Sequence, residues 1–220
     1  MAALTNALQA LSTRAKQTIT RRPNAVADLH KAVRDAVQNH AAALTQHGPQ
    51  IDALLNAMAA VDAAALNIDG VQRPGACTYL GIVENDEYAI AAFLLEPHAK
   101  IPLHDHPNMT VLSRVVRGSL RVTSFDVGAD GKARRSSSIM TSADGPAALF
   151  PSVNNVHEFR AGAGGAVVLD VIVPPYDEDR GRACHYFEAV ACNGGVFRLR
   201  EIPEPADFEC LGAVYNGLRP

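Results

Sequence analysis

The chain has 220 residues, which allows one large domain or two small ones with a substantial hydrophobic core. Hydrophobic residues make up 48% and charged residues 20%, so the composition excludes a disordered chain. The net charge of −3 argues against a nucleic-acid binder, and no apolar run is long enough for a transmembrane helix. We therefore expect no nucleic-acid or membrane partner, and we also expect a monomer.

The first 70 residues are rich in alanine and carry three amphipathic helical patterns. The apolar positions of these patterns span residues 4–19, 26–37 and 51–61. Three consecutive apolar faces indicate parts of one packing arrangement. We expect residues 1–70 to form an N-terminal helical segment that packs on a second unit, residues 71–220.

Residues 1–27 contain basic residues and no acidic one, which is also typical of a mitochondrial transit peptide. The four cysteines are too few for a disulfide scaffold and indicate reduced thiols. Reduced thiols predict a cytoplasmic protein, and the match of the first helical pattern to the two that follow argues against its being cleaved off. A mitochondrial location is the alternative.

After Gly70 the apolar segments become short, β-branched and aromatic, with glycine, proline and asparagine between them. The expected strands are residues 88–95, 110–116, 119–125, 147–150 and 166–173. Gly118 predicts a hairpin turn between the second and third of these strands. Residues 128–145 are expected to be a polar connection with a short strand around Ser138–Met140. The pattern predicts a mainly β fold, a sandwich or barrel behind a helical layer.

Two histidines have the spacing of metal ligands, and a third is a candidate to join them. His104 and His106 are one residue apart in an extended segment, so both imidazoles share one face while Asp105 points away. His157 follows between two β segments. Three neutral imidazoles on a six-coordinate ion leave three positions for other ligands. The alternative is that these are ordinary surface or core histidines.

The spacing of these histidines is similar to the two metal motifs of cupin barrels, although Val111 stands where the first motif has its glutamate. Two longer segments carry a more specific resemblance. The stretch IPLHDHPNMTVLSRVVRGSLRVTSFD and the stretch VVLDVIVPPYDEDRGRACHYF resemble the plant cysteine oxidase and 2-aminoethanethiol dioxygenase family of thiol dioxygenases. With the tail REIPEPADFECLGAVYNG, the resemblance covers residues 77–217.

This resemblance implies a cupin double-stranded β-helix, a jelly-roll barrel, that binds non-haem iron(II). It implies that O2 oxidises a thiol to a sulfinic acid, the thiol being cysteamine or the N-terminal cysteine of a polypeptide. The motif spelling is nearer to the plant members, which favours the polypeptide. The implied iron ligands are His104, His106 and His157, and the implied catalytic residues are Asp170 and Tyr176.

The implied pocket residues have alternative roles. Asp170 could pair with the substrate ammonium, hold a ligand imidazole in one tautomer, or bind loop amides. Tyr176 could donate its phenol to bound oxygen or only pack. Cys184 and Tyr186 match a pair proposed to cross-link in some animal members, and ordinary β packing is the alternative.

Several other functions stay open at this point. Three histidines also describe a zinc-dependent site, and a cupin can be a non-enzymatic binding protein. A free-cysteine dioxygenase would need a cation for the substrate carboxylate, for which Arg114 and Arg117 are the candidates on the strand that follows the HxH segment. An oxygen sensor and a metabolic enzyme are both compatible with the motifs.

Overall fold

The computed structural model describes residues 24–217, so the expected helix at 4–19 lies outside the described residues. Its helices are α2 (Ala25–His40) and α3 (Pro49–Ala59), with 3-10 turns η1 (Ala41–Thr45), η2 (Ile68–Gly70) and η3 (Glu178–Arg180). The strands are β1 (Cys77–Glu84), β2 (Ala89–Leu95), β3 (Lys100–His104), β4 (Thr110–Val127), β5 (Ala133–Thr141), β6 (Ala147–Leu149), β7 (Val156–Val173), β8 (Tyr186–Ala191), β9 (Phe197–Ile202) and β10 (Cys210–Ala213). No helix in this range is long and apolar enough to cross a lipid bilayer.

Both described helices begin with local signals in the sequence. The side chain of Asn24 accepts a hydrogen bond from the backbone N–H of Ala27 at 3.2 Å, which caps α2. Pro49 occupies the first turn of α3, where its missing N–H needs no partner. The expected helices at 26–37 and 51–61 are confirmed.

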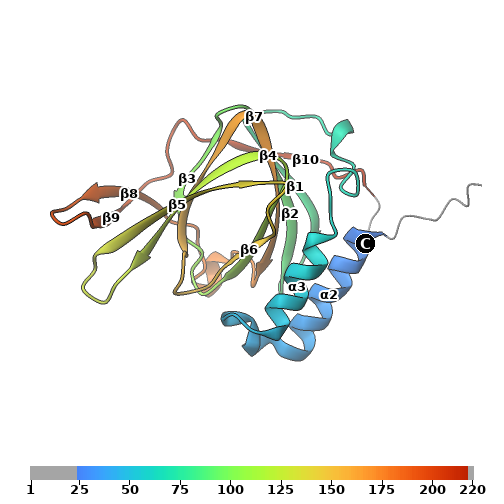
Figure 1. Cartoon of the computed structure of the whole chain (residues 1–220), viewed down its shortest axis with the longest axis horizontal. Helices are drawn as coiled ribbons and strands as arrows, with labels where there is room; N and C mark the ends of the chain where they lie inside the picture. Colours follow the sequence, from blue (N-terminus) through green and yellow to red (C-terminus); the bar gives the residue numbers. More distant parts are fainter. Residues whose placement is uncertain (1–23, 218–220) are drawn as a thin grey trace, which may run out of the picture.

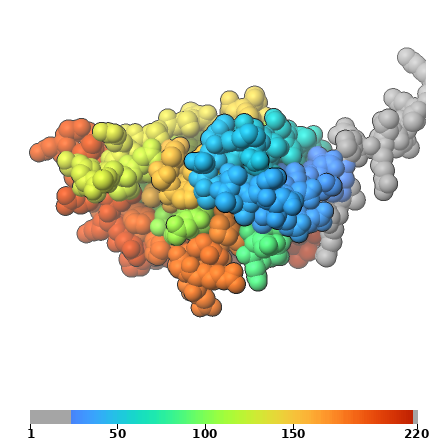
Figure 2. Space-filling view, turned by 90° about the horizontal axis from the view of Figure 1, so that it is seen from below, coloured from blue at the N-terminus to red at the C-terminus, as the bar shows by residue number. Residues whose placement is uncertain are grey.

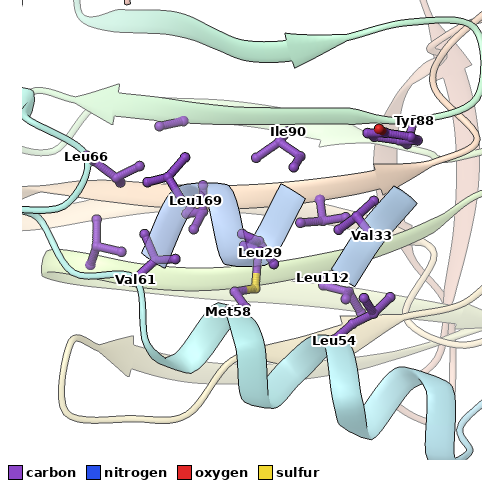
Figure 3. Packing of buried hydrophobic residues seen from close by; sticks show 14 of the residues in the cluster. Leu29, Val33, Leu54, Met58, Val61, Leu66, Tyr88, Ile90, Leu112 and Leu169 are labelled. Carbon is purple, nitrogen blue, oxygen red and sulfur yellow. The ribbon is translucent and has the colours of Figure 1, made fainter. Parts of the chain in front are cut away.

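The two helices form one layer against the side of the barrel (Figures 1 and 2). Figure 3 shows Leu29 of α2 and Met58 of α3 among barrel residues that include Ile90 and Leu169, all of them buried. Because helices and strands share one hydrophobic cluster, truncating Leu29 to alanine should cost about 2–5 kcal/mol of folding free energy. The division at residue 70 stays a prediction.

The ten strands form one sheet in the order β10-β1-β2-β7-β3-β8-β9-β5-β4-β6, and an additional pairing of β7 with β4 closes the barrel. The two longest strands, β4 and β7, pair antiparallel from Thr110↔Val173 to Phe125↔Val156. Side chains on the inner face of these strands therefore come together inside the barrel. The predicted fold class, a mainly β barrel with an N-terminal helical layer, is confirmed.

The predicted hairpin at Gly118 is wrong, because β4 runs without interruption from Thr110 to Val127. Gly118 has a φ of +75° and lies at a shift in the register between β4 and β7. A side chain at this position would collide with the carbonyl oxygen of Gly165. Turns and bulges both select glycine for a positive φ, so the residue type alone did not distinguish them.

Two other strands are longer than expected. β7 begins at Val156 and not at 166, because the glycine-containing stretch 162–165 lies within the strand at the register shift. β5 extends over Ala133–Thr141, where only a short strand was expected. Its exposed serines and arginines hide the alternation that marks a half-buried strand. As a result, β7 carries His157 and Asp170 on one continuous element.

Candidate metal site

The three predicted ligands come from two neighbouring strands and one loop. His104 ends β3 and is the register partner of His157, near the start of β7. His106 lies two residues beyond His104, in the loop. Asn155 holds this loop in place: its Oδ1 accepts from the His106 N–H at 3.1 Å, and its Nδ2 donates to the His106 carbonyl at 2.7 Å. The two hydrogen bonds of the Asn155 amide thus support His106, which lies beyond the last paired residue of β3, His104.

The imidazoles of His104, His106 and His157 converge. Their ring centroids are 4.8–4.9 Å apart, and one candidate ligand atom from each lies within 4.8 Å of the others. The Nε2 atoms of His106 and His157 are 3.1 Å apart. Two nitrogens bound at about 2.1 Å to one ion and at right angles would be separated by about 3 Å. In the part of the chain that the structure describes, this is the one group of side chains with the geometry to hold a metal ion.

Hydrogen bonds orient two of the three rings. The Nδ1 atom of His104 lies 2.8 Å from the carbonyl oxygen of Pro102, so Nδ1 carries the proton and Nε2 keeps its lone pair. The Nδ1 atom of His106 lies 2.8 Å from the phenol oxygen of Tyr176, and that phenol donates to the Asp105 carbonyl oxygen at 2.7 Å. Because the phenol proton is used at Asp105, Tyr176 accepts from His106. Both rings then present Nε2 as a ligand.

Burial keeps the cluster neutral. His104, His106 and His157 are 8%, 4% and 4% exposed. Desolvation lowers the pKa of His104, against the opposing effect of its hydrogen bond to Pro102. Desolvation lowers the pKa values of His106 and His157 further, and the neighbouring imidazoles add to this effect. Neutral imidazole is the form that binds a metal, so the environment favours the binding-competent state.

Asp170 contributes a buried carboxyl group to the same site. It is 5% exposed and is the register partner of Ser113, whose side chain opposes part of the shift in its pKa. Its Oδ1 has no hydrogen-bond partner. Desolvation raises the pKa of Asp170 to about 7. A buried carboxyl oxygen without a partner indicates a place for a ligand that donates hydrogen bonds or carries positive charge.

These groups line a cavity of about 310 Å³. Its walls are Tyr79, Phe93, Ile101, His104, His106, His157, Phe159, Asp170, Ile172, Tyr176, Cys184, Tyr186, Phe208 and Cys210. The walls include aromatic and aliphatic side chains and no lysine or arginine. All five residues expected at the site are therefore brought together, in a cavity whose one carboxyl group is that of Asp170.

The two candidate cations lie elsewhere. Arg114 is the register partner of Leu169, one residue away from the Ser113–Asp170 pair, so its side chain leaves the opposite face of β4. Leu169 belongs to the cluster under the helices. Arg117 forms an ion pair with Asp69 at 2.7 Å. Neither arginine lines the cavity.

Known proteins identify the family. The family model described as PCO_ADO matches residues 33–219. The chain belongs to this family. It is 38% identical over 147 residues to the probable 2-aminoethanethiol dioxygenase of Dictyostelium discoideum, an alignment that covers 63% of this chain and 66% of that protein. The 2-aminoethanethiol dioxygenase of Homo sapiens is 33% identical over 180 residues, with 64% of this chain and 67% of that protein covered.

The chain is also similar to a plant protein and to a solved cupin structure. Plant cysteine oxidase 1 of Arabidopsis thaliana is 38% identical over 120 residues, which are 50% of this chain and 41% of that protein. The chain thus spans about two thirds, or less, of the length of these three relatives. Among solved structures, an RmlC-like cupin from Shewanella frigidimarina is 18% identical, with a TM-score of 0.39, and covers 50% of this chain and 86% of its own.

In this PCO_ADO chain the structure adds supporting residues that the sequence did not reveal. Asn155 holds the His106 loop, and the carboxylate of Asp105 accepts from the His185 N–H at 2.9 Å, which ties the same loop to the start of β8. Asp105, predicted to point away from the metal face, thus holds the His106 loop. Its position between the two histidines in the sequence could have indicated this role. No spacing in the sequence indicated the role of Asn155.

Cys184 and Tyr186 both line the cavity, and Cys184 is a free thiol. Burial raises the pKa of both groups, and each contributes to the pKa shift of the other. The cross-link that the resemblance suggests and ordinary β packing both stay open for this pair.

Proposed function

We propose that the protein is an iron(II) thiol dioxygenase that oxidises an aminothiol without a free carboxylate to a sulfinic acid. The substrate would be cysteamine or the N-terminal cysteine of a polypeptide, and O2 would supply both oxygen atoms. One observation carries the proposal: three neutral histidines and the unpartnered carboxyl of Asp170 share a cavity that has no basic side chain. The names of the relatives, 2-aminoethanethiol dioxygenase and plant cysteine oxidase, support the reaction class.

His104, His106 and His157 would hold the metal through Nε2. Bound iron would supply the redox chemistry and positions for the thiolate and O2. Three neutral ligands leave the positive charge of the ion intact, so an anionic thiolate is favoured as a further ligand. The protein itself keeps the rings neutral and aimed inward, and its apolar walls limit access of water to the site.

Asp170 would bind the substrate ammonium. Its Oδ1 has no other partner, and a cation beside it would lower the pKa of the buried carboxyl and favour the charged form. Nδ1 of His104 and Nδ1 of His106 are already held by Pro102 and Tyr176, so these two rings do not need Asp170 to fix their tautomers. A substrate carboxylate in the same cavity would face like-charge repulsion.

Tyr176 would act through His106. Burial raises the pKa of its phenol well above the usual value, so the hydroxyl stays protonated and keeps donating to Asp105. Tyr176 would therefore position the ring of His106 and would not donate a hydrogen bond to bound oxygen.

We also propose that the protein is a monomer in the cytoplasm and has no nucleic-acid or membrane partner. All four cysteines are free thiols, which supports a reducing compartment.

The test compares three thiols under one oxygen tension. Purified protein is loaded with iron(II) without air, then supplied with O2 and cysteamine, free cysteine or a peptide that begins with cysteine. Mass spectrometry should show products heavier by two oxygen atoms, with a kcat/KM for free cysteine at least about tenfold below that for the better aminothiol. Protein loaded with zinc serves as the control and should form no product. A preference for free cysteine, or equal turnover with zinc, would contradict the proposal.

A further inference from the structure

Two cysteines far apart in the sequence meet on neighbouring strands. Cys77 begins β1 and Cys210 begins β10, and the two residues are register partners in a parallel pairing. Their sulfur atoms lie 2.6 Å apart although 133 positions separate them in the chain. Both are free thiols. No step of the proposed thiol oxidation uses this pair.

The backbone already has the spacing of a disulfide. Neighbouring strands lie about 4.8 Å apart, inside the range of about 4.4–6.8 Å between the Cα atoms of bonded cysteines. The contact between the sulfurs shows that both side chains turn toward each other. A bond between them would therefore require no rearrangement of β1 or β10.

The pair lies between two cavities. Cys210 and Phe208 line the cavity of the three histidines. Cys77 and Phe208 line a second cavity of about 490 Å³, whose rim includes the charged residues Lys100 and Asp207. The second cavity therefore lies against Cys77, and a small reagent would reach Cys210 from the side of the histidine cavity.

The position of the pair gives it a structural consequence. β10 has four residues, and β1 is its one partner strand among the described residues. Its first residue and the preceding Phe208 are part of the wall of the histidine cavity. A covalent bond at Cys210 would fix this wall to the barrel at the point where the pairing begins.

We propose that Cys77 and Cys210 form a reversible thiol–disulfide site that fastens β10 to the barrel beside the metal cavity. The oxidant is a low-molecular-weight disulfide, RSSR. The Cys210 thiolate attacks one sulfur of RSSR, the S–S bond breaks, and RS⁻ leaves. The Cys77 thiolate then attacks the Cys210 sulfur and releases the second RS⁻. The two protons from the cysteines end on two RSH molecules, and the two electrons reduce RSSR.

The environment sets the order of the two attacks. The hydrogen bond from Cys77 lowers the pKa of Cys210, while the same contact and burial raise that of Cys77. Cys77 is 1% exposed and Cys210 is partly exposed. Cys210 is therefore the more accessible thiol and the one that ionises more readily, and Cys77 is the resolving thiol.

The experiment titrates the full chain with mixtures of oxidised and reduced glutathione, both metal-loaded and after chelation. Free thiols are trapped with an alkylating reagent, and peptides are mapped by mass spectrometry. A cross-linked peptide joining Cys77 to Cys210 should appear, with the loss of two hydrogens, and disappear with dithiothreitol. In Cys77→Ala the reaction should stop at a glutathione adduct on Cys210, whereas Cys192→Ala, at an exposed cysteine, should leave the cross-link intact. Cross-links that involve Cys184 or Cys192, or adducts alone in the unmodified protein, would overturn the proposal.

A second measurement tests the fastening of β10. Oxidation should slow hydrogen exchange at residues 210–213 by at least about tenfold and raise Tm by about 5–10 °C. Neither effect should occur in Cys77→Ala. A cross-link that leaves exchange in β10 unchanged would overturn the structural consequence. Neither readout requires turnover, so failure here and failure of the proposed thiol oxidation are distinguishable.

Discussion

The phenol oxygen of Tyr176 lies 2.8 Å from Nδ1 of His106 and 2.7 Å from the carbonyl oxygen of Asp105. One hydroxyl thus accepts from the ring and donates to the backbone of the residue before it. The contact fixes both the tautomer and the rotation of the His106 ring. His106 lies in a loop beyond the end of β3, so it lacks the strand pairing that supports His104.

Replacing Tyr176 with phenylalanine should weaken metal binding. Removal of the hydroxyl leaves Nδ1 of His106 without its partner, and changes of this kind cost about 10–100-fold in metal affinity. Competition with a chelator measures the Kd for iron(II). Tyr88→Phe is the matched control, because Tyr88 is a buried tyrosine that also hydrogen-bonds to a histidine, His30, on helix α2. Equal affinity loss in both variants would contradict a specific role of Tyr176.

Single substitution of His104, His106 or His157 with alanine should remove most bound metal, because two ligands do not hold the ion as three do. The barrel should stay folded, since much of its core lies in the cluster under the helices. Metal analysis of the purified variants, with circular dichroism to monitor folding, measures this effect. His40→Ala, at the exposed end of α2, is the control and should retain the metal. Near-normal occupancy in a ligand variant would remove that residue from the site.

Asp170→Asn should stabilise the metal-free protein at alkaline pH and slow turnover of the loaded enzyme. Burial raises the pKa of Asp170 from 3.8 to about 7. Between pH 3.8 and about 7 the carboxyl is protonated in the folded state but ionised in the unfolded state, so the free energy of unfolding falls as pH rises. The full loss of stability is present above pH 7. Removing the charge should then increase the free energy of unfolding at pH 8 by a few kcal/mol and leave it nearly unchanged at pH 4.

Urea denaturation at both pH values measures the stability effect of Asp170→Asn, and iron content and kcat/KM are measured in parallel. Iron should be retained, because the histidines are unchanged, while kcat/KM should fall because the ammonium partner is lost. Unchanged kcat/KM would show that the carboxyl has only a structural role.

The sequence predicted the local features of this molecule well. The period of the apolar residues located α2 and α3, and the spacing of His104 and His106 indicated one shared face. The distant His157 was placed with them by the family resemblance, and the structure supplies the reason, which is the register pairing of His104 with His157. That pairing depends on how β3 and β7 align, and no local pattern encodes it.

The features that sequence reasoning missed depend on tertiary contacts. Gly118 has the conformation of a turn residue, but the carbonyl of Gly165 lies where a side chain would be, so the residue marks a bulge. Asn155 binds the His106 loop across 49 positions, and Cys77 meets Cys210 across 133. Such contacts follow from the closed barrel, which brings distant segments together after the local elements are set.

Arg114 bears on which thiols the cavity selects. A dioxygenase for free cysteine needs a cation for the carboxylate, and Arg114 is the nearest arginine in sequence to the HxH segment. In the pairing of β4 with β7, Arg114 lies opposite Leu169, so its side chain is on the outer face of β4, toward the helical layer, and not on the inner face that carries Ser113. Its Nε is buried without a hydrogen-bond partner, so its aliphatic stem and not its charge should matter for packing.

Arg114→Met keeps much of that packing volume and removes the charge. We expect the ratio of kcat/KM for free cysteine to that for cysteamine to change by less than about twofold, since a cation on the outer face of β4 does not reach the bound substrate. The ratio is measured for the variant and the unmodified protein side by side, with the same iron content. A fall of about tenfold or more with free cysteine alone would mean that the arginine binds the carboxylate. The aminothiol specificity proposed for the cavity would then be wrong, because a cation would be acting on the substrate from outside the walls that the structure assigns to it.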